Sequence, residues 1–337
     1  MEISDFCSQS RVLIVAGKGG VGKTTMVAAL AHMAAQAGLS VLVVELEGRG
    51  GVATAFGSED PLDYVGSVLR AAGAEPEPED DSVHSIPKGT VRARTITPDD
   101  ALLEYLADHG MRRISKRLLS SGIIDIVAGA IPGIRDILVL GKVKQIERSG
   151  IADLVLVDAP ATGHTMTFLS SAGGLLDAAR GGPIRSQAAE VVDLLSDPAR
   201  CQVALVTLPE EMPVNEVIEA AYQLEDKVGI ALGPVIVNGC YPPLDRLDTP
   251  ADQAVADAGV VLGPDLVATL EEARTFRLTR QELQREQLLR LARELPLPQL
   301  QVPFIFAASI GPDELDGLSA ALAAGVRALH DPAPVAP

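Results

Sequence analysis

The stretch Gly17-Lys-Gly-Gly-Val-Gly-Lys-Thr-Thr25 decides the fold of this chain. A glycine followed five residues later by Gly-Lys-Thr is the spacing of a phosphate-binding loop, in which backbone N–H groups curl around phosphate oxygens. In such a loop Lys23 reaches the β- and γ-phosphates and the Thr24 hydroxyl ligates Mg²⁺. The sequence therefore predicts a nucleotide site that includes the whole loop: Gly17, Lys18, Gly19, Gly20, Val21, Gly22, Lys23, Thr24 and Thr25.

The residues on either side of the loop fit a strand before it and a helix after it. Arg11–Ala16 is an apolar run typical of a buried strand. From Lys23 to Ala37 apolar residues recur with the period of a helix, and Gly38 marks its end. Phosphate bound by the loop would therefore also lie at a helix N-terminus, where the helix dipole favours an anion.

Further short apolar runs alternate with helical patterns along the chain. Runs that are apolar throughout are typical of parallel strands covered on both faces. We therefore expect an α/β fold with a doubly wound, mostly parallel sheet. Its predicted strands are Arg11–Ala16, Ser40–Glu45, Ala152–Asp158, Cys201–Thr207 and Pro234–Val237, with Val302–Phe306 as a sixth candidate.

Two long stretches interrupt this alternation within a single predicted domain of residues 11–310. The first, about 60–150, is expected to form a helical subdomain insert, and the second, about 244–297, to be helical as well. The insert opens with the acidic, proline-rich Glu75–Asp81, which we expect to be a mobile loop. Residues 331–337 are expected to be a disordered tail.

Two helix starts are marked in these stretches. Thr97 has the features of an N-cap, because Pro98 follows it and Asp100 comes three residues later. Gly110 is expected to end that helix. Thr279-Arg-Gln-Glu282 has the form of a capping box and predicts a second helix start.

Composition and charge exclude several classes of function. The 337 residues carry 28 Lys and Arg against 45 Asp and Glu, a net charge of −17 that opposes nucleic-acid binding. Aromatic residues make up 3% and Trp is absent, so base-stacking platforms are not expected. The sequence contains no apolar run of about 18 residues, so we expect no stable membrane insertion. The first eleven residues also lack the apolar core of a secretory signal.

The three cysteines, Cys7, Cys201 and Cys240, are scattered without C-x-x-C spacing. This pattern indicates the reduced thiols of a cytoplasmic protein rather than a disulfide framework or a zinc site. We therefore expect no functional metal beyond Mg²⁺.

A second lysine, Lys18, directly follows the first glycine of the loop. A side chain there points away from the phosphates of its own loop. It is either a solvated surface charge or a cation that crosses a dimer interface to the nucleotide of the facing subunit. With this lysine the loop resembles that of the signature-lysine P-loop ATPases: MinD/ParA, the nitrogenase iron protein and the ArsA/GET ATPases. The resemblance implies an ATP hydrolase that acts as a dimer, with Lys18 and Lys23 as catalytic residues.

Two carboxylates follow the second predicted strand in Glu45-Leu-Glu47. Alternate residues leave a strand on the same side, so both either face the phosphates or are surface charges. MinD/ParA proteins have aspartate-x-aspartate here, and targeting ATPases have an aspartate at the position of Glu47. The resemblance implies that Glu47 positions or deprotonates the attacking water and that Glu45 lies near the water shell of the metal. Gly48–Gly51 replaces the family's proline-alanine-histidine-asparagine, so we expect a flexible switch loop of altered geometry.

A third strand pattern, Leu154-Val-Leu-Val-Asp158, is that of a Walker B strand, whose acid holds Mg²⁺, often through water. Thr162-Gly-His-Thr165 resembles the switch II segment of ArsA/GET ATPases, which implies that His164 belongs to a γ-phosphate sensor. A buried structural histidine is the alternative. Ile131-Pro-Gly-Ile-Arg-Asp136 resembles a proline-glycine-isoleucine-aspartate-glutamate segment of the same family and distinguishes the chain from MinD and ParA.

Four further positions match residues that contact nucleotide in this family. Thr207-Leu-Pro-Glu210 resembles the threonine-x-proline-glutamate motif, which implies that Glu210 approaches the nucleotide of the partner. Asn238 falls where the family has its adenine-reading asparagine, an amide that both donates and accepts. The resemblance also implies that Pro303 and Phe304 cover the other side of the base. It spans about residues 11–310, with one phosphate-binding loop, so the chain resembles half of a duplicated ArsA.

Two functions fit this resemblance. The first is a cytoplasmic Mg²⁺-dependent ATPase, a homodimer or a heterodimer with a paralogue, that handles a hydrophobic or membrane-protein client. The alternative is a regulatory or positioning switch like MinD, without client transport. Ser319–His330 carries too little positive charge for the membrane-binding helix of MinD. The cysteines match neither the arsenite site of the arsenical pump ATPase nor the zinc clasp of eukaryotic targeting factors. A ligase or synthetase would need a substrate pocket that the sequence does not identify.

Two segments of the predicted insert leave alternatives open. Ile123–Ile134 has a single charge, at Asp125, and is either a buried helix or one wall of an apolar groove for a client. The basic cluster before it is either a solvated helix face or a surface for an anionic partner. This cluster consists of Arg112, Arg113, Lys116 and Arg117.

Overall fold

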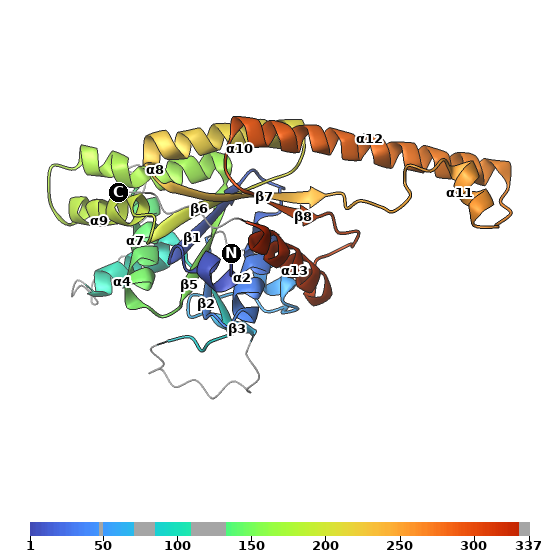
Figure 1. The fold of residues 1–337 in the computed structure, drawn as a ribbon. Coiled ribbons are helices and arrows are strands. Elements are labelled where there is room, and N and C mark those ends of the chain that lie inside the picture. Colours follow the sequence, from blue (N-terminus) through green and yellow to red (C-terminus); the bar gives the residue numbers. More distant parts are fainter. Residues whose placement is uncertain (47–49, 71–84, 109–132, 330–337) are drawn as a thin grey trace.

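The computed structural model describes residues 1–46, 50–70, 85–108 and 133–329. In this part of the chain an eight-stranded sheet has the strand order β3-β4-β2-β5-β1-β6-β7-β8 (Figure 1). Neighbouring strands are parallel except β3 and β4, which are antiparallel. The predicted α/β fold with a mostly parallel sheet is confirmed. The strands are β1 (Val12–Gly17), β2 (Val41–Glu45), β3 (Ser67–Arg70), β4 (Val91–Thr95), β5 (Leu154–Ala161), β6 (Cys201–Thr207), β7 (Ala231–Cys240) and β8 (Gln299–Pro303).

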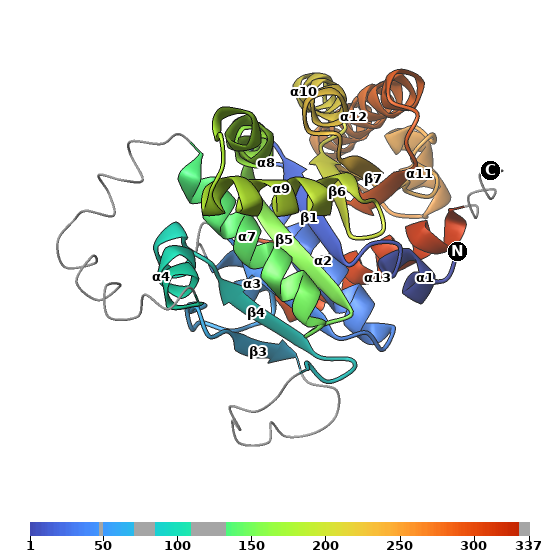
Figure 2. The same cartoon turned by 90° about the vertical axis from the view of Figure 1, so that its left-hand side faces the viewer.

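Helices cover both faces of the sheet (Figure 2). One face packs against α4 (Pro98–Asp108), α7 (Ile134–Ser149), α8 (Thr162–Ala178), α9 (Pro183–Ser196), α10 (Glu211–Gln223) and the C-terminal part of α12 (Pro264–Glu294). The other packs against α1 (Ile3–Cys7), α2 (Lys23–Gln36), α3 (Gly51–Ala55) and α13 (Pro312–Ala328). A short π-helix, Leu224–Val228, continues α10, and α11 (Ala251–Asp257) precedes α12.

The apolar core is divided by the sheet into two clusters. Successive side chains of a strand point to opposite faces, so Ile14 of β1 packs with one set of helices and Val15 with the other. Both are almost fully buried, as are Leu140 of α7 on the first face and Leu30 of α2 on the second. This two-sided burial explains why the central strands are apolar throughout.

The structure corrects the strand predictions in two places. The last strand, Gln299–Pro303, lies three residues before the predicted Val302–Phe306. Two strands inside residues 60–150, Ser67–Arg70 and Val91–Thr95, were not predicted. In Val91-Arg-Ala-Arg-Thr95 polar residues alternate with buried ones, because this strand lies near the sheet edge and its arginines stay half-exposed. This strand was therefore not among the predicted ones, which were all recognised as runs of apolar residues.

One of the two predicted helix starts is confirmed and the other is wrong. The Asp100 N–H donates to the Thr97 hydroxyl oxygen at 3.2 Å, and the hydroxyl donates to the Asp100 carboxylate at 2.6 Å. Thr279 instead lies in the middle of α12, which begins after Gly263. Its hydroxyl donates to the Thr275 carbonyl oxygen at 2.9 Å, four residues back. Inside a helix the hydroxyl of a threonine can donate to the carbonyl oxygen four residues back. A sequence that resembles a capping box therefore does not require a helix to begin there.

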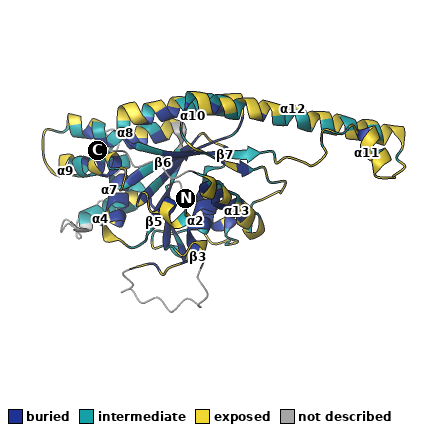
Figure 3. Cartoon of the chain, in the orientation of Figure 1, coloured by how far each residue is buried: buried dark blue, intermediate teal, exposed yellow. Residues whose placement is uncertain are grey.

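The segment from Pro242 to Leu283, called the arm below, projects beyond the carboxyl ends of β7 and β8 (Figure 1). It contains α11 and the N-terminal two thirds of α12, a helix of 31 residues. The only buried residues of α12 are Gln284 and Leu291, where the helix reaches the sheet. Most of the arm is therefore exposed (Figure 3).

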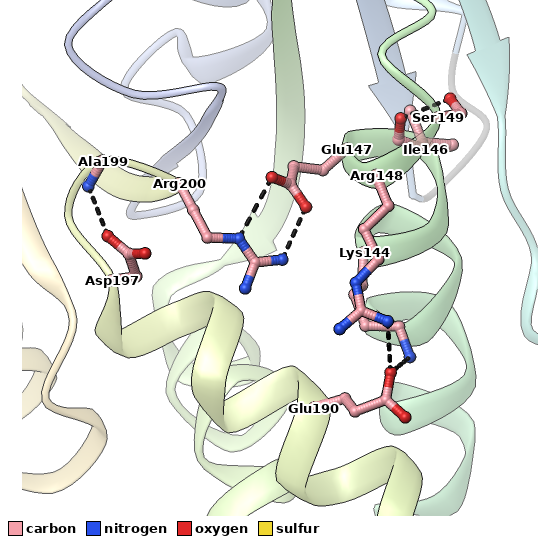
Figure 4. A network of polar contacts seen from close by, with 9 residues as sticks. All are labelled: Lys144, Ile146, Glu147, Arg148, Ser149, Glu190, Asp197, Ala199 and Arg200. Carbon is pink, nitrogen blue, oxygen red and sulfur yellow. Dashed lines mark hydrogen bonds and ion pairs between the residues drawn. The ribbon is translucent and has the colours of Figure 1, made fainter.

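Helix α7 is fixed to its neighbours by ion pairs that lie at its C-terminal half (Figure 4). Arg200, just before β6, binds the buried Glu147 at 2.7 Å. Lys144 and Arg148 share Glu190 of α9, at 3.0 and 2.6 Å. A buried carboxylate with a hydrogen-bonded guanidinium is costly to break, so α7 is held firmly at this end.

Several expectations fall outside the described residues. They concern the loop Glu75–Asp81, the end of a helix at Gly110, the basic cluster Arg112–Arg117, most of Ile123–Ile134, the switch segment 47–49 and the tail 331–337.

Candidate nucleotide site

The predicted site residues come from the same edge of the sheet. The phosphate-binding loop follows β1, Glu45 ends β2, Asp158 lies near the end of β5, and Asn238 lies near the end of β7. Glu45 and Asp158 are direct register partners on neighbouring strands. Parallel strands place their carboxyl ends together, and this crevice is where open α/β sheets bind ligands.

Two glycines of the loop are required by their surroundings. A Cβ on Gly17 would lie 2.4 Å from the Val206 carbonyl oxygen of β6. Gly22 has φ +91°, and a Cβ there would lie 2.5 Å from Nδ2 of Asn238. These close contacts are to groups of β6 and β7, so the loop is packed against the carboxyl ends of these strands.

The two residues that begin α2 have their side chains turned toward the loop and β5. The Lys23 ammonium donates to the carbonyl oxygen of Lys18 at 3.1 Å, which places it over the loop. The Thr24 hydroxyl donates to the Asp158 carboxylate at 2.6 Å. A hydroxyl and a carboxylate oxygen therefore lie side by side where the sequence analysis expected Mg²⁺.

Glu45 is buried, with 2% of its surface exposed, and its carboxylate accepts two backbone hydrogen bonds. One oxygen accepts from Gly50 N–H at 3.1 Å and the other from Val52 N–H at 3.0 Å. These bonds hold the first turn of α3 at the end of β2. Gly51 in that turn lies against the loop, since a Cβ on it would lie 2.7 Å from the Thr24 side chain. Glu45 thus ties the end of the switch segment to β2, a contact that no sequence pattern indicated. Glu47 lies outside the described residues.

Asn238 lies under the loop on the side of β7. Its Nδ2 donates to the Val21 carbonyl oxygen at 3.0 Å. The backbone N–H of Phe304 donates to the Cys240 carbonyl oxygen at 2.8 Å, which continues the pairing of β7 with β8 beyond Pro303. Asn238, Pro303 and Phe304 are therefore at the ends of adjacent strands.

An aromatic cluster adjoins Phe304. The rings of Tyr241 and Phe306 are stacked 6.1 Å apart, and the ring of Phe304 lies 4.7 Å from that of Phe306 at an edge. The guanidinium of Arg277, from the arm, lies 4.2 Å from the Tyr241 ring centroid. Neither Tyr241 nor Arg277 was predicted as a site residue from the sequence. A signal that could have pointed to this cluster is the scarcity of aromatic residues, because Phe304 and Phe306 are two of only six phenylalanines.

The two residues expected to reach a partner subunit are each bound within their own chain. The Lys18 ammonium donates to the Glu216 carboxylate of α10 at 2.5 Å. Glu210 accepts from the Arg280 guanidinium of α12 at 3.0 Å. Both Lys18 and Glu210 remain about half exposed, with 47% of each side chain accessible.

The segment that resembles switch II begins α8. Thr165 is buried, and its hydroxyl donates to the Pro160 carbonyl oxygen at 2.5 Å. His164 is exposed and lies near Asp136 of α7. Burial raises the pKa of Asp136, and the charge of His164 lowers it in part. The structure therefore brings together two segments of the family resemblance that are separate in the sequence.

The three cysteine side chains are buried or partly buried, and only Cys240, at the end of β7, lies near the candidate site. Burial raises the pKa of the Cys7 thiol to about 12 and that of Cys240 to about 11. Within the described ranges, no group of three or more His, Cys, Asp or Glu side chains is placed to hold a metal ion. The helices that the structure describes include none with the length and apolar character needed to cross a membrane.

A glycine loop between a strand and a helix, with a carboxylate on the adjacent strand at the Thr24 hydroxyl, defines this chain as a P-loop ATPase. Residues 12–295 match the family model described as the CobQ/CobB/MinD/ParA nucleotide binding domain. The chain belongs to that family and, within it, to the ArsA/GET-type ATPases.

Three relatives illustrate this membership. ATPase BagA of Mycobacterium tuberculosis is 34% identical over 322 residues, which cover 88% of this chain and 87% of the relative. The arsenical pump-driving ATPase of Escherichia coli is 27% identical, over 67% of this chain but 34% of its own length. ATPase get3 of Schizosaccharomyces japonicus is 30% identical over 47% of this chain and 43% of its own.

Proposed function

We propose that this chain is a Mg²⁺-dependent ATPase that works as a dimer and changes conformation with its nucleotide. The observation that carries the proposal is the contrast between the two loop lysines. Lys23 is turned onto its own loop, whereas Lys18 is turned out toward α10 with half its side chain exposed. Lys23 would bind phosphate in its own subunit, and Lys18 would add positive charge at the nucleotide of the facing subunit.

The donors at the loop fit Mg²⁺. The Thr24 hydroxyl and the Asp158 carboxylate are hard oxygen ligands, and they already lie 2.6 Å apart. Glu45 fits a contact through water, because its oxygens are engaged by backbone N–H groups. When bound, the ion would neutralise negative charge on the phosphate oxygens. Glu47 would position the attacking water.

The remaining assignments concern the nucleotide. The loop residues Gly17–Thr25 would surround the phosphates, and Asn238, Pro303 and Phe304 would contact adenine. Asn238 uses one of its two amide N–H bonds on the loop. Its carboxamide oxygen remains suited to accept from the adenine amino group. Glu210 would approach the nucleotide of the partner, a second copy or a paralogue.

A positioning switch like MinD is the weaker candidate. In this chain residues 319–328 of the segment compared with the membrane helix of MinD belong to α13, whose Leu318, Leu322 and Val326 are buried against the sheet and α2. An apolar face used in the core is not available to a membrane. We therefore favour action on a hydrophobic or membrane-protein client, in the cytoplasm.

The roles of the two lysines are separable by substitution. Lys23→Ala should abolish ATP binding in calorimetry. Lys18→Ala should keep ATP binding and lower phosphate release by about a thousandfold, as expected for a trans-supplied cation. Omitting Mg²⁺ should stop hydrolysis in the wild type. Equal loss of ATP binding in both variants would exclude the trans role of Lys18.

Client handling needs a separate experiment. Glu47→Gln should retain ATP and hold the dimer in its ATP state, so a client should co-purify with this variant in ATP. The matched control is the same variant in ADP. A client recovered equally with both nucleotides, or a partner that is not hydrophobic, would contradict nucleotide-driven handling.

A further inference from the structure

The contact between Lys18 and Glu216 joins residues 198 positions apart in the sequence. The Lys18 ammonium and one Glu216 carboxylate oxygen are 2.5 Å apart, and the Glu216 side chain is 32% exposed. A charged hydrogen bond orients an otherwise flexible lysine side chain. The direction is toward α10 of its own subunit.

The carboxylate is poorly satisfied without Lys18. Its second oxygen, Oε2, is buried and has no hydrogen-bond partner in the part of the chain that the structure describes. Beneath the pair lie mainly apolar groups, including Val206, Pro213, Val217 and Ala220. If the Lys18 side chain moved away, Glu216 would remain as a half-buried negative charge next to apolar side chains, which costs free energy.

We propose that Glu216 is a positioning residue that holds Lys18 in its own subunit and thereby opposes its transfer to the nucleotide of the partner. The inference rests on the proposed trans role of Lys18. A second copy with bound nucleotide offers more negative charge than Glu216 and attracts the lysine away. The contact therefore raises the protein concentration needed for activation and favours dimers that carry nucleotide in the facing subunit.

The pairing of Glu210 with Arg280 follows the same logic. Glu210 is the other residue expected to cross to the partner, and it too is held by an opposite charge of its own chain. Both contacts neutralise a charge at the proposed dimer face before the partner arrives. Both pairs are partly exposed, so each holds its residue weakly enough to be exchanged.

The size of the effect follows from this exposure. Partly exposed ion pairs change an equilibrium by about fivefold at most. Glu216→Gln keeps the shape of the side chain and removes its charge. We expect the protein concentration that gives half-maximal ATPase activity to fall about threefold to fivefold, with the rate at saturating protein changed by less than twofold. Glu219→Gln, an equal charge change on the exposed side of the same helix, should leave both quantities unchanged.

A second measurement tests the contact in the absence of a partner. Acetylation of Lys18 by an N-hydroxysuccinimide ester, followed by peptide mass spectrometry without nucleotide, reports how freely the amine is exposed. Glu216→Gln should accelerate acetylation of Lys18 several-fold and leave that of Lys227 unchanged. A merely structural role of Glu216 would lower stability without this selective change.

The outcomes separate the two proposals. Full ATPase activity in Lys18→Ala would overturn the trans role itself. Loss of activity in Lys18→Ala, together with unchanged acetylation of Lys18 in Glu216→Gln, would overturn the holding contact alone. Faster acetylation with an unchanged half-maximal concentration would show that the contact exists but does not oppose activation, which also overturns the inference.

Discussion

The sheet with its phosphate-binding loop differs from the projecting arm in how far its apolar side chains are buried. In the sheet, Leu156 of β5 and Leu205 of β6 are essentially inaccessible to solvent. In the arm, Val261 is 98% exposed and Leu266 is 50% exposed. An open groove of about 420 Å³, lined largely by apolar side chains, lies between α11, α12 and residues 244–249.

This difference shows where the molecule needs fixed geometry. The loop, Glu45 and Asp158 are placed by strands that are buried on both faces, so small displacements are resisted. The arm is fixed to the sheet only near its root, where Gln284 of α12 meets the end of β7. Its tip is held by local contacts between α11 and α12. Exposed helices with few buried contacts belong to the less stable regions of a protein.

The largest expected effect is the loss of a core side chain. Leu156→Ala should lower the free energy of unfolding by about 3 kcal/mol, because it leaves a cavity in the sheet core. Leu266→Ala, the same change in the arm, should cost less than about 0.5 kcal/mol. Guanidinium denaturation of both variants measures this. Similar losses would show that the arm is packed as firmly as the sheet.

The loop itself should be sensitive to one methyl group. Gly22→Ala should cost about 2 kcal/mol, since the residue has a positive φ and the methyl would meet Asn238. It should also weaken ATP binding at least tenfold. Gly38→Ala is the control, because Gly38 has φ +85° but no atom near its Cβ position. It should cost about 1 kcal/mol and leave ATP binding unchanged. Calorimetry with ATP distinguishes the two.

The root of the arm should show an intermediate effect. The buried Gln284 accepts from Tyr241 N–H at 2.8 Å and donates to the Gly239 carbonyl oxygen at 3.0 Å. Gln284→Ala leaves both groups unsatisfied and should cost about 1–2 kcal/mol. Gln281→Ala removes one exposed bond to Pro242 and should cost less than about 0.5 kcal/mol. Hydrogen exchange should show a loss of amide protection at the root of the arm in Gln284→Ala. Protection unchanged from that of the wild type would contradict this prediction.

The smallest effect concerns pH at the tip of the arm. Arg274 and the Ala251 N–H both donate to Glu271, and they lower its pKa to about 2. The pKa of Glu271 is depressed in the folded state. Its contribution to stability is therefore complete above the usual pKa of a glutamate and is lost as the pH falls toward 2. The amides of α11 should therefore stay protected from exchange at pH 5 and lose protection between pH 4 and 2. Glu271→Gln should remove this pH dependence, and an unchanged profile would contradict the assignment.

Sequence predicts best where structure is local. The strand, loop and helix from Val12 to Gln36 follow from contiguous residues, and so does the cap at Thr97. Prediction fails where distant contacts choose between local options. Val91–Thr95 is a strand because β2 and β3 pair with it, and Thr279 continues a helix because nothing at Thr279 interrupts it.

The sequence by itself determined the phosphate-binding loop, the parallel sheet and the type of chemistry, because spacing and apolar runs carry that information. The tertiary structure alone decided the pairing of side chains around the loop. Glu45 holds Gly50 and Val52, and Lys18 meets Glu216 across 198 residues. Such contacts arise when separate strands and helices meet at one sheet edge, and no local pattern records which charges will face each other there.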